Sequence, residues 1–267
     1  MKNSVADKWG CSSNGIGLGN DDLHVWKVSL DQDKTTILKM SALLAPDECR
    51  RAEKYFRSID RDRFIIARGV LRKILSAYLR ISPYELLFVY NEYGKPALSA
   101  DQNCHALSFN LSHSDGMALY AVARGRRVGV DIENIRKDFA TLDIAEHFFS
   151  KDEVESLKTV PTGLRTEAFF NCWSRKESYI KAIGMGVSYP LDGFTVSLAP
   201  NVVPALLKVD ADECEPTRWQ MYELNAGEGY AASAIVENPP VTLRQWQCAL
   251  WKEANINCAL INSRNFW

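Results

Sequence analysis

Apolar and polar residues alternate in several short segments of the chain, and this period of two residues is typical of half-buried strands. In the first half of the chain, the pattern predicts strands at 22–30, 86–90, 107–114, 117–123 and 128–133. Apolar residues spaced three and four positions apart predict helices instead. One predicted helix begins at Pro46, and a longer one follows it with an apolar face formed by Phe64, Ala67, Leu71, Leu75 and Leu79.

The second half of the chain repeats this order of helices followed by strands. Ser150 and Glu153 have the spacing of a capping box, which predicts that a short helix begins there. A long helix is predicted over 169–183, and Gly184 is expected to end it as a C-cap. Further strands are predicted at 194–198, 205–209, 219–224 and 230–236.

These patterns divide the chain into four segments. Residues 1–20 are rich in Gly, Ser and Asn and are predicted to form a flexible N-terminal arm. Residues 21–125 form an N-terminal half, and residues 126–238 form a C-terminal half. Residues 239–267 begin with a Pro-Pro pair and form an extension, which either packs on the body or serves as an accessory segment.

Composition and charge exclude several classes of protein. With 267 residues, 46% of them hydrophobic, the chain can bury a substantial core. Its net charge of −1 indicates neither a nucleic-acid nor a membrane partner. The seven cysteines are scattered and lack a Cys-x-x-Cys pair, which favours a reducing cytoplasm over a zinc site or a disulfide framework. No apolar segment approaches the ~20 residues that a membrane-spanning helix requires.

The first motif that carries chemistry is Gly129-Val130-Asp131-Ile132-Glu133, in a predicted strand. Successive side chains on a strand point to opposite faces, so Asp131 and Glu133 share the face away from the alternating apolar residues. Two neighbouring carboxylates repel each other unless a cation lies between them. Taken alone, however, an Asp-x-Glu pair is usually a solvated strand face.

The second motif is Trp173-Ser174-Arg175-Lys176-Glu177-Ser178-Tyr179-Ile180-Lys181, in the long predicted helix. At about 100° per residue, Glu177 falls within the apolar stripe of this helix and Lys181 lies at its edge. A carboxylate on a core-facing stripe needs a partner, because an unpaired buried charge is costly. Taken alone, a Lys-Glu pair is usually surface charge. Here a cation shared by three carboxylates would supply the partner, which favours a magnesium-type site.

In this order and spacing, the two motifs resemble the signature of 4′-phosphopantetheinyl transferases of the surfactin-synthetase-activating (Sfp) type. The resemblance extends from about residue 23 to residue 236. It implies an α+β fold of two pseudo-symmetric halves with the active site between them, in a monomer that acts as a pseudo-dimer. It also implies transfer of 4′-phosphopantetheine from coenzyme A to a serine of an apo acyl or peptidyl carrier protein, releasing 3′,5′-ADP.

This holo-acyl-carrier-protein synthase type of reaction, together with the resemblance, suggests roles for four acidic and basic residues. Asp131, Glu133 and Glu177 would hold magnesium, or manganese as a substitute. Because a serine hydroxyl is a weak nucleophile, it needs a base, and Glu177 is the residue expected to serve as one. Lys181, one helical turn later, would neutralise charge on the pyrophosphate as the leaving group departs.

The resemblance also implies which residues contact coenzyme A. The residues expected to contact its phosphates are Arg63, Lys95, Ser112 and His113. Two basic residues that the family often carries on its first helix align with Glu48 and Arg51. Arg51 fits the family pattern, whereas Glu48 departs from it and removes half of the expected clamp for the 3′-phosphate.

Two other functions are compatible with the same residues. A magnesium-dependent coenzyme A or nucleotide pyrophosphatase could use the three carboxylates to release phosphopantetheine to water. A non-catalytic module that binds carrier proteins could keep the fold without the chemistry. The absence of a Gly-x-Ser-x-Gly segment argues against a hydrolase triad around His113.

Overall fold

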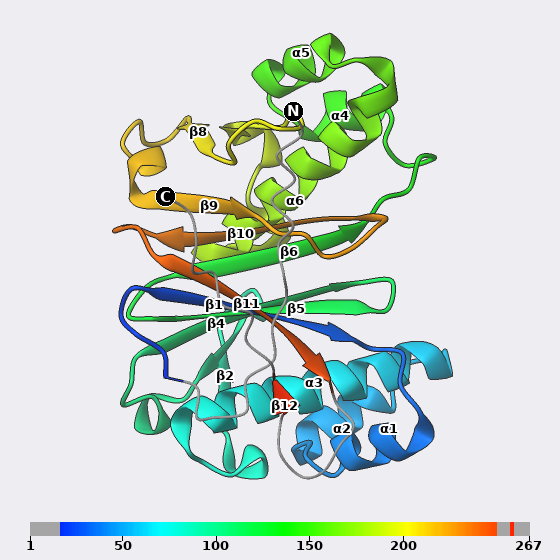
Figure 1. Cartoon of the computed structure of the whole chain (residues 1–267), viewed down its shortest axis with the longest axis vertical. Coiled ribbons are helices and arrows are strands. Elements are labelled where there is room, and N and C mark those ends of the chain that lie inside the picture. Colours follow the sequence, from blue (N-terminus) through cyan, green and yellow to red (C-terminus); the bar gives the residue numbers. More distant parts are fainter. Residues whose placement is uncertain (1–16, 250–256, 259–267) are drawn as a thin grey trace.

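In the computed structural model, which describes residues 17–249 and 257–258, alternate residues of the first strand face two different layers. Strand β1 (Asp22–Ser29) buries Leu23 and Val25 against a second sheet, and Trp26 and Val28 against a group of helices. Since successive strand residues point to opposite faces, a strand that is apolar at nearly every position can separate two cores. This double burial produces the layered arrangement seen in Figure 1.

The first half of the protein is a sheet covered on one face by helices. In chain order its elements are β1, α1 (Lys34–Ser41), α2 (Pro46–Ala52), α3 (Ser58–Leu79), β2 (Phe88–Tyr90), β3 (Pro96–Leu98), β4 (Leu107–Ser114) and β5 (Met117–Arg124). Strand β5 lies between β1 and β4 and is antiparallel to both. The largest core lies between α3 and this sheet (Figure 1).

The second half repeats this arrangement. Its elements are β6 (Val128–Asn134), α4 (Leu142–Phe148), α5 (Lys151–Thr159), α6 (Arg165–Ile183), β7 (Phe194–Val196), β8 (Leu206–Val209), β9 (Trp219–Glu223) and β10 (Tyr230–Glu237). Strand β10 lies between β6 and β9 and is antiparallel to both, as β5 is to β1 and β4. The order β6-β10-β9 therefore reproduces β1-β5-β4, and the predicted α+β fold of two pseudo-symmetric halves is confirmed.

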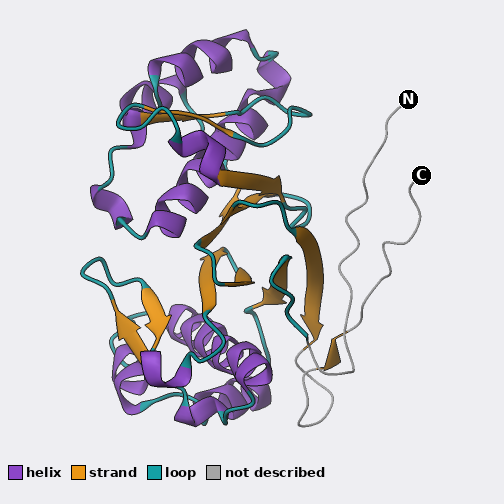
Figure 2. Ribbon diagram, turned by 90° about the vertical axis from the view of Figure 1, so that its left-hand side faces the viewer, coloured by secondary structure: helices purple, strands orange, loops and turns teal. Residues whose placement is uncertain are grey.

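The two halves meet through their sheets, with the helices on the outside (Figures 1 and 2). A third core lies between the sheets and is formed by apolar residues of β1, β5, β6 and β10. Strands β4 and β6 are both edge strands, and a side chain joins them where backbone pairing is absent. The amide oxygen Oδ1 of Asn110 on β4 accepts a hydrogen bond of 2.9 Å from the backbone N–H of Val130 on β6.

The described part of the C-terminal extension packs on the first half. Strand β11 (Thr242–Ala249) pairs in parallel with β1, and the short β12 (Asn257–Cys258) pairs with β11. Trp246 is 2% exposed and stacks on Trp26, with 4.9 Å between the ring centroids. Most of the predicted N-terminal arm and the remainder of the extension lie outside the described residues.

Most predicted elements are present, with boundaries that differ by a few residues. Ser150 caps α5 through the predicted capping box, and Gly184 ends α6 in the left-handed conformation, with a φ of 76°. The sequence pattern missed α1 and α4, because both are short and tertiary packing rather than a long apolar stripe fixes them. Among the described residues, no helix is both long and apolar enough to cross a membrane.

The stacking of Trp246 predicts that β11 stabilises the first half. Trp246→Ala should lower the free energy of unfolding by about 3–5 kcal/mol, the usual cost of removing a buried aromatic side chain. Trp246→Phe keeps an aromatic ring against Trp26 and should cost clearly less. Urea denaturation of the full chain measures both values, and equal stability of Trp246→Ala and the wild type would contradict this role of β11.

Candidate active site

The site begins with a close approach between a strand and a helix. Gly129 on β6 faces α6, and a Cβ atom at this position would lie 1.9 Å from the carbonyl oxygen of Ser178 and 2.7 Å from the backbone nitrogen of Ala182. Only glycine fits such an approach of two backbones. Asp131, two residues further on, lies on the same strand face and is therefore held directly against the last turns of α6.

Asp131 is the centre of a hydrogen-bond network that joins three elements. Its side chain is 1% exposed, and its Oδ1 accepts hydrogen bonds from Lys181 Nζ on α6 (2.6 Å) and Ser112 Oγ on β4 (2.8 Å). Lys181 Nζ also donates to Ser112 Oγ at 2.8 Å. The other oxygen, Asp131 Oδ2, is buried and has no hydrogen-bond partner among the described residues. A buried carboxylate oxygen without a partner is costly, and this oxygen is free to accept a hydrogen bond or a cation.

Two further carboxylates lie within electrostatic range of Asp131. Burial, together with the charge of Asp131, raises the pKa of Glu133 to about 7, although Lys181 and Ser114 oppose this rise. Burial and Asp131 also raise the pKa of Glu177, and Lys181 again opposes the rise. The charge of Asp131 therefore makes Glu133 and Glu177 harder to ionise, and a cation among the three carboxylates would offset this repulsion.

The donor atoms fit a hard divalent cation. All three candidate ligands are carboxylates, and oxygen donors are the ligands of magnesium and manganese rather than of zinc. Within residues 17–249 and 257–258, however, no three His, Cys, Asp or Glu side chains already stand close enough to form a metal cluster. The Lys181 ammonium donates a hydrogen bond to Oδ1 of Asp131. The unpartnered Oδ2 is therefore the oxygen of Asp131 that would bind a cation.

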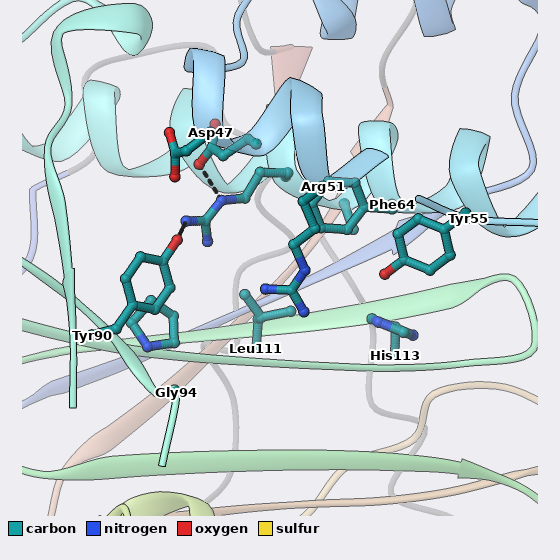
Figure 3. A pocket seen from close by; sticks show the side chains of 12 residues that line it. Asp47, Arg51, Tyr55, Phe64, Tyr90, Gly94, Leu111 and His113 are labelled. Atoms are coloured by element: carbon teal, nitrogen blue, oxygen red, sulfur yellow. Dashed lines mark hydrogen bonds and ion pairs between the residues drawn. The ribbon is translucent and has the colours of Figure 1, made fainter. Parts of the chain in front are cut away.

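A pocket of about 510 Å³ adjoins this network, between α2, α3, the β2–β3 hairpin and β4. Arg51 from α2 and His113 from β4 point into it from opposite sides, and Tyr55 and Phe64 supply aromatic walls (Figure 3). The pocket's other lining residues are Asp47, Glu48, Ala67, Arg68, Tyr90, Gly94, Pro96 and Leu111. His113 directly follows Ser112 on the edge strand β4. Because successive side chains of a strand point to opposite faces, Ser112 faces Asp131 whereas His113 faces the pocket.

The charges around the pocket suit an anionic ligand. The surrounding protein lowers the pKa of His113, and the positive charges of Lys181, Arg63 and Arg51 lower it further. Arg63 on α3 reaches the β4–β5 turn, where its Nη1 lies 3.6 Å from Asp115 Oδ1, and its Nε donates a hydrogen bond of 2.7 Å to Asp31 Oδ1. Hydrogen bonding to Asp31 raises the pKa of Arg63, which therefore stays charged.

Glu48 has a structural position that explains its departure from the family pattern. Its side chain is 2% exposed, and Oε2 accepts hydrogen bonds from the backbone N–H of Ala45 (2.8 Å) and from Arg72 Nε (2.6 Å). Oε1 accepts a hydrogen bond from Arg68 Nε. Glu48 therefore accepts the Ala45 N–H at the start of α2 and pairs with two buried arginines, a role that its sequence neighbours alone do not reveal.

Lys95 lies outside the group of residues that line the pocket. Its Nζ donates to the carbonyl oxygens of Lys181 (2.5 Å) and Ala182 (3.1 Å) at the end of α6. The expected site residues therefore fall into three places. Ser112 joins Asp131 and Lys181, with Glu133 and Glu177 nearby. Arg51 and His113 line the pocket. Arg63, which pairs with Asp31, and Lys95, which binds the end of α6, lie outside the pocket lining.

Sequence reasoning also missed residues that support the site. Lys176 is fully buried, and its Nζ lies 2.7 Å from the equally buried Glu153 Oε2 and donates to the carbonyl oxygens of Leu191 and Phe194. This ion pair fixes the turn of α6 that carries Glu177. The available signal was a lysine on the apolar stripe of the helix, which needs a partner as much as a buried carboxylate does.

Two family profiles match consecutive parts of the chain. One family profile, described as 4′-phosphopantetheinyl transferase, N-terminal, matches residues 26–124. A second, described as 4′-phosphopantetheinyl transferase superfamily, matches residues 127–235. The boundary between the two matches falls in the turn that connects β5 to β6.

Individual relatives extend over most of the chain. The chain is 33% identical over 236 residues to the 4′-phosphopantetheinyl transferase HetI of Nostoc sp., covering 88% of this chain and 94% of that protein. It is 29% identical over 196 residues to the 4′-phosphopantetheinyl transferase Sfp of Bacillus subtilis, covering 73% and 84% respectively. The holo-[acyl-carrier-protein] synthase of Thermotoga maritima aligns over 42% of this chain and 62% of that chain, with 20% identity and a TM-score of 0.34.

The repeated halves, joined through Ser112, Asp131 and Lys181, define a two-half α+β fold with a carboxylate site between its sheets and a pocket in its first half. The chain belongs to the 4′-phosphopantetheinyl transferase superfamily. The resemblance to the Sfp type inferred from the two motifs is thereby confirmed. The chain transfers phosphopantetheine to carrier proteins, as its family does.

The raised pKa of Glu133 predicts how stability depends on pH. An acid with a higher pKa in the folded than in the unfolded state binds more protons when folded. Its contribution to stability is therefore present below pH 4.5 and lost as the pH rises to about 7. Glu133→Gln cannot ionise and should lack this loss, so the difference in unfolding free energy between the variant and the wild type should grow across this range. Urea denaturation in EDTA measures it, and a difference independent of pH would contradict the prediction.

Proposed function

We propose that the chain is a magnesium-dependent enzyme of the holo-acyl-carrier-protein synthase type, which takes its phosphopantetheine from coenzyme A. The observation that carries this proposal is the buried, unpartnered Oδ2 of Asp131, with the carboxylates of Glu133 and Glu177 nearby. This oxygen-rich position adjoins, through Ser112 and His113, a pocket with cationic and aromatic walls. A nucleotide carrying a pyrophosphate has the chemistry to occupy both places at once.

The pocket would hold the adenosine end of coenzyme A. Arg51 and His113 point into it and would pair with phosphate oxygens, while Tyr55 and Phe64 offer aromatic surface to the base. Arg51 lies over the ring of Phe64, 5.4 Å from its centroid, and this contact orients the guanidinium toward the cavity. Arg63 on α3, which pairs with Asp31, is close enough to lower the pKa of His113 and adds positive charge near the pocket.

The pyrophosphate would then lie over the acidic site. Asp131 Oδ2, Glu133 and Glu177 would hold the magnesium ion, which when bound draws charge from the pyrophosphate oxygens. Ser112 and Lys181 fix Asp131 through Oδ1, so that Oδ2 keeps its direction. These residues are positioned by β4, β6 and α6, and both halves therefore contribute to one site.

Glu177 is the proposed general base. Its pKa is raised by burial and by Asp131, which brings it closer to the pH at which the enzyme works and makes the carboxylate a better proton acceptor. The carrier serine Oγ forms a bond to the β-phosphorus of coenzyme A, and its proton passes to Glu177. The bond from that phosphorus to the bridging oxygen breaks, and 3′,5′-ADP leaves with the electron pair. The Lys181 ammonium would offset the charge that develops on the leaving group.

The acceptor would be an apo acyl or peptidyl carrier protein, and the enzyme would act as a monomer. A monomer suffices because the second half of the same chain supplies the metal ligands and the first half supplies the pocket. The same carboxylates could in principle serve a pyrophosphatase, or lose their chemistry in a binding module. Transfer differs from both in the fate of the phosphopantetheine group.

Mass spectrometry of an apo carrier protein, incubated with the chain, coenzyme A and magnesium, tests the proposal. Transfer should add one phosphopantetheine group to the carrier and release an equal amount of 3′,5′-ADP. A pyrophosphatase would release 3′,5′-ADP without changing the mass of the carrier, and a binding module would do neither. Loss of the mass increase on addition of EDTA is expected, and full activity in EDTA would remove magnesium from the proposal.

Two variants separate metal binding from base catalysis. Asp131→Asn weakens the metal site but leaves the proposed base, so saturating magnesium should restore much of its transfer rate. Glu177→Gln keeps an oxygen ligand but cannot accept a proton, so it should stay about 10²–10⁴-fold slower at any magnesium concentration. Initial rates of carrier modification against magnesium concentration measure both. Full rescue of Glu177→Gln by magnesium would assign the base to another group.

A further inference from the structure

Strand β4 presents its two faces to two different sites. Leu111 and His113 line the pocket of the first half. Asn110, Ser112 and Ser114 alternate with them and therefore share the opposite face. All three of these polar side chains form hydrogen bonds with β6 of the second half. One strand therefore contacts both the proposed coenzyme A pocket and the acidic site.

The hydrogen bonds between β4 and β6 keep a constant offset along the two strands. Their partners are separated by 19 or 20 residues at every position. A constant offset means that the two strands run side by side in the same direction. Each is the edge strand of its own sheet, and no backbone pairing between them occurs within residues 17–249 and 257–258. Side chains of β4 therefore make the contacts that a paired strand would make with its backbone.

Two backbone N–H groups of β6 depend on these side chains. The N–H of Val130 donates to Asn110 Oδ1 at 2.9 Å, and the N–H of Asn134 donates to Ser114 Oγ at 3.0 Å. A buried N–H group needs an acceptor, because water cannot reach it. Val130 and Asn110 are both buried. The bond between them is therefore the contact of this row that water cannot replace.

The position of this bond connects it with the proposed chemistry. Val130 lies between Gly129, where β6 approaches α6, and Asp131, which faces Ser112. A shift of β6 along β4 would move Asp131 relative to His113. It would therefore change the distance between the acidic site and the pocket.

We propose that Asn110 is a positioning residue that sets the register between the two halves, and with it the distance from the pocket to the acidic site. This inference rests on the proposed function. Coenzyme A bound by its adenosine end in the first half must present its pyrophosphate to the carboxylates of the second half. Asn110 therefore acts on the rate of transfer, whereas the affinity for the adenosine end depends on the pocket.

Kinetics of two matched variants test the proposal. Asn110→Leu nearly keeps the size of the side chain but removes the acceptor. It should lower kcat by about 10–100-fold, the usual cost of displacing reacting groups by up to ~1 Å, and leave the KM for coenzyme A within about twofold. Asn103 also accepts a backbone N–H, that of Leu107 at 2.7 Å, but entirely within the first half. Asn103→Leu should therefore keep the wild-type kcat.

Hydrogen exchange at the Val130 amide, followed by NMR, measures the proposed bond directly. This amide should be protected in the wild type and should exchange at least about tenfold faster in Asn110→Leu, because its acceptor is lost. Asn103→Leu should leave its exchange unchanged. If Asn110→Leu fails to fold, which thermal melting detects, the wild type decides, and an unprotected Val130 amide there would overturn the proposal.

Three kinetic or exchange results would contradict this role of Asn110. An unchanged kcat or an unchanged exchange rate of Val130 in Asn110→Leu would overturn it. A rise in KM for coenzyme A with normal kcat would make Asn110 a ligand contact instead. An equal fall of kcat in Asn103→Leu would trace the loss to general destabilisation. A wild-type chain that transfers nothing would refute the proposed function, while exchange at Val130 would still test the register.

Discussion

The approach of α6 to β6 at Gly129 is the contact on which the site depends. Any side chain at this position would clash with the backbone of α6. The two elements can approach this closely only because Gly129 has no side chain. The same closeness lets Lys181 reach Asp131, and it buries the Asp131 carboxylate almost completely. A strand and a helix separated by ordinary side chains would leave both groups in water, where their interaction would be weak.

Burial at this contact gives the acidic cluster its chemical character. Carboxylates that share a region shielded from water resist ionisation, as the raised pKa values of Glu133 and Glu177 indicate. The residues that oppose this rise in pKa come from different elements, with Ser114 on β4 and Lys181 on α6. The first half therefore supplies polar groups to a charge cluster that is carried by the second half, and neither half alone would stabilise it.

The sequence predicted those parts of the site that follow from local periodicity. The alternation around Asp131 and the helical position of Glu177 placed two carboxylates toward a common region before any tertiary contact was known. Contacts between distant segments were beyond this reasoning. Nothing near Glu48 in the chain reveals the arginines that bury it, and nothing near Lys95 reveals that a helix end lies opposite. The role of the C-terminal extension was equally hard to predict. Strand β11 forms only because it pairs with β1, and the sequence around β11 does not reveal that partner.

The parallel pairing of β11 with β1 gives the chain an unusual connectivity. The polypeptide leaves the first sheet after β5, forms the entire second half, and then returns to the first sheet as β11. Residues 125–241 are thus a closed loop whose two ends are anchored in one sheet. If the second half alone unfolded, its chain could not expand freely, and the entropy it gained would be smaller than that of a free segment. The returning strand therefore favours the folded second half through the connectivity of the chain, in addition to the packing of Leu243 on the core between the sheets.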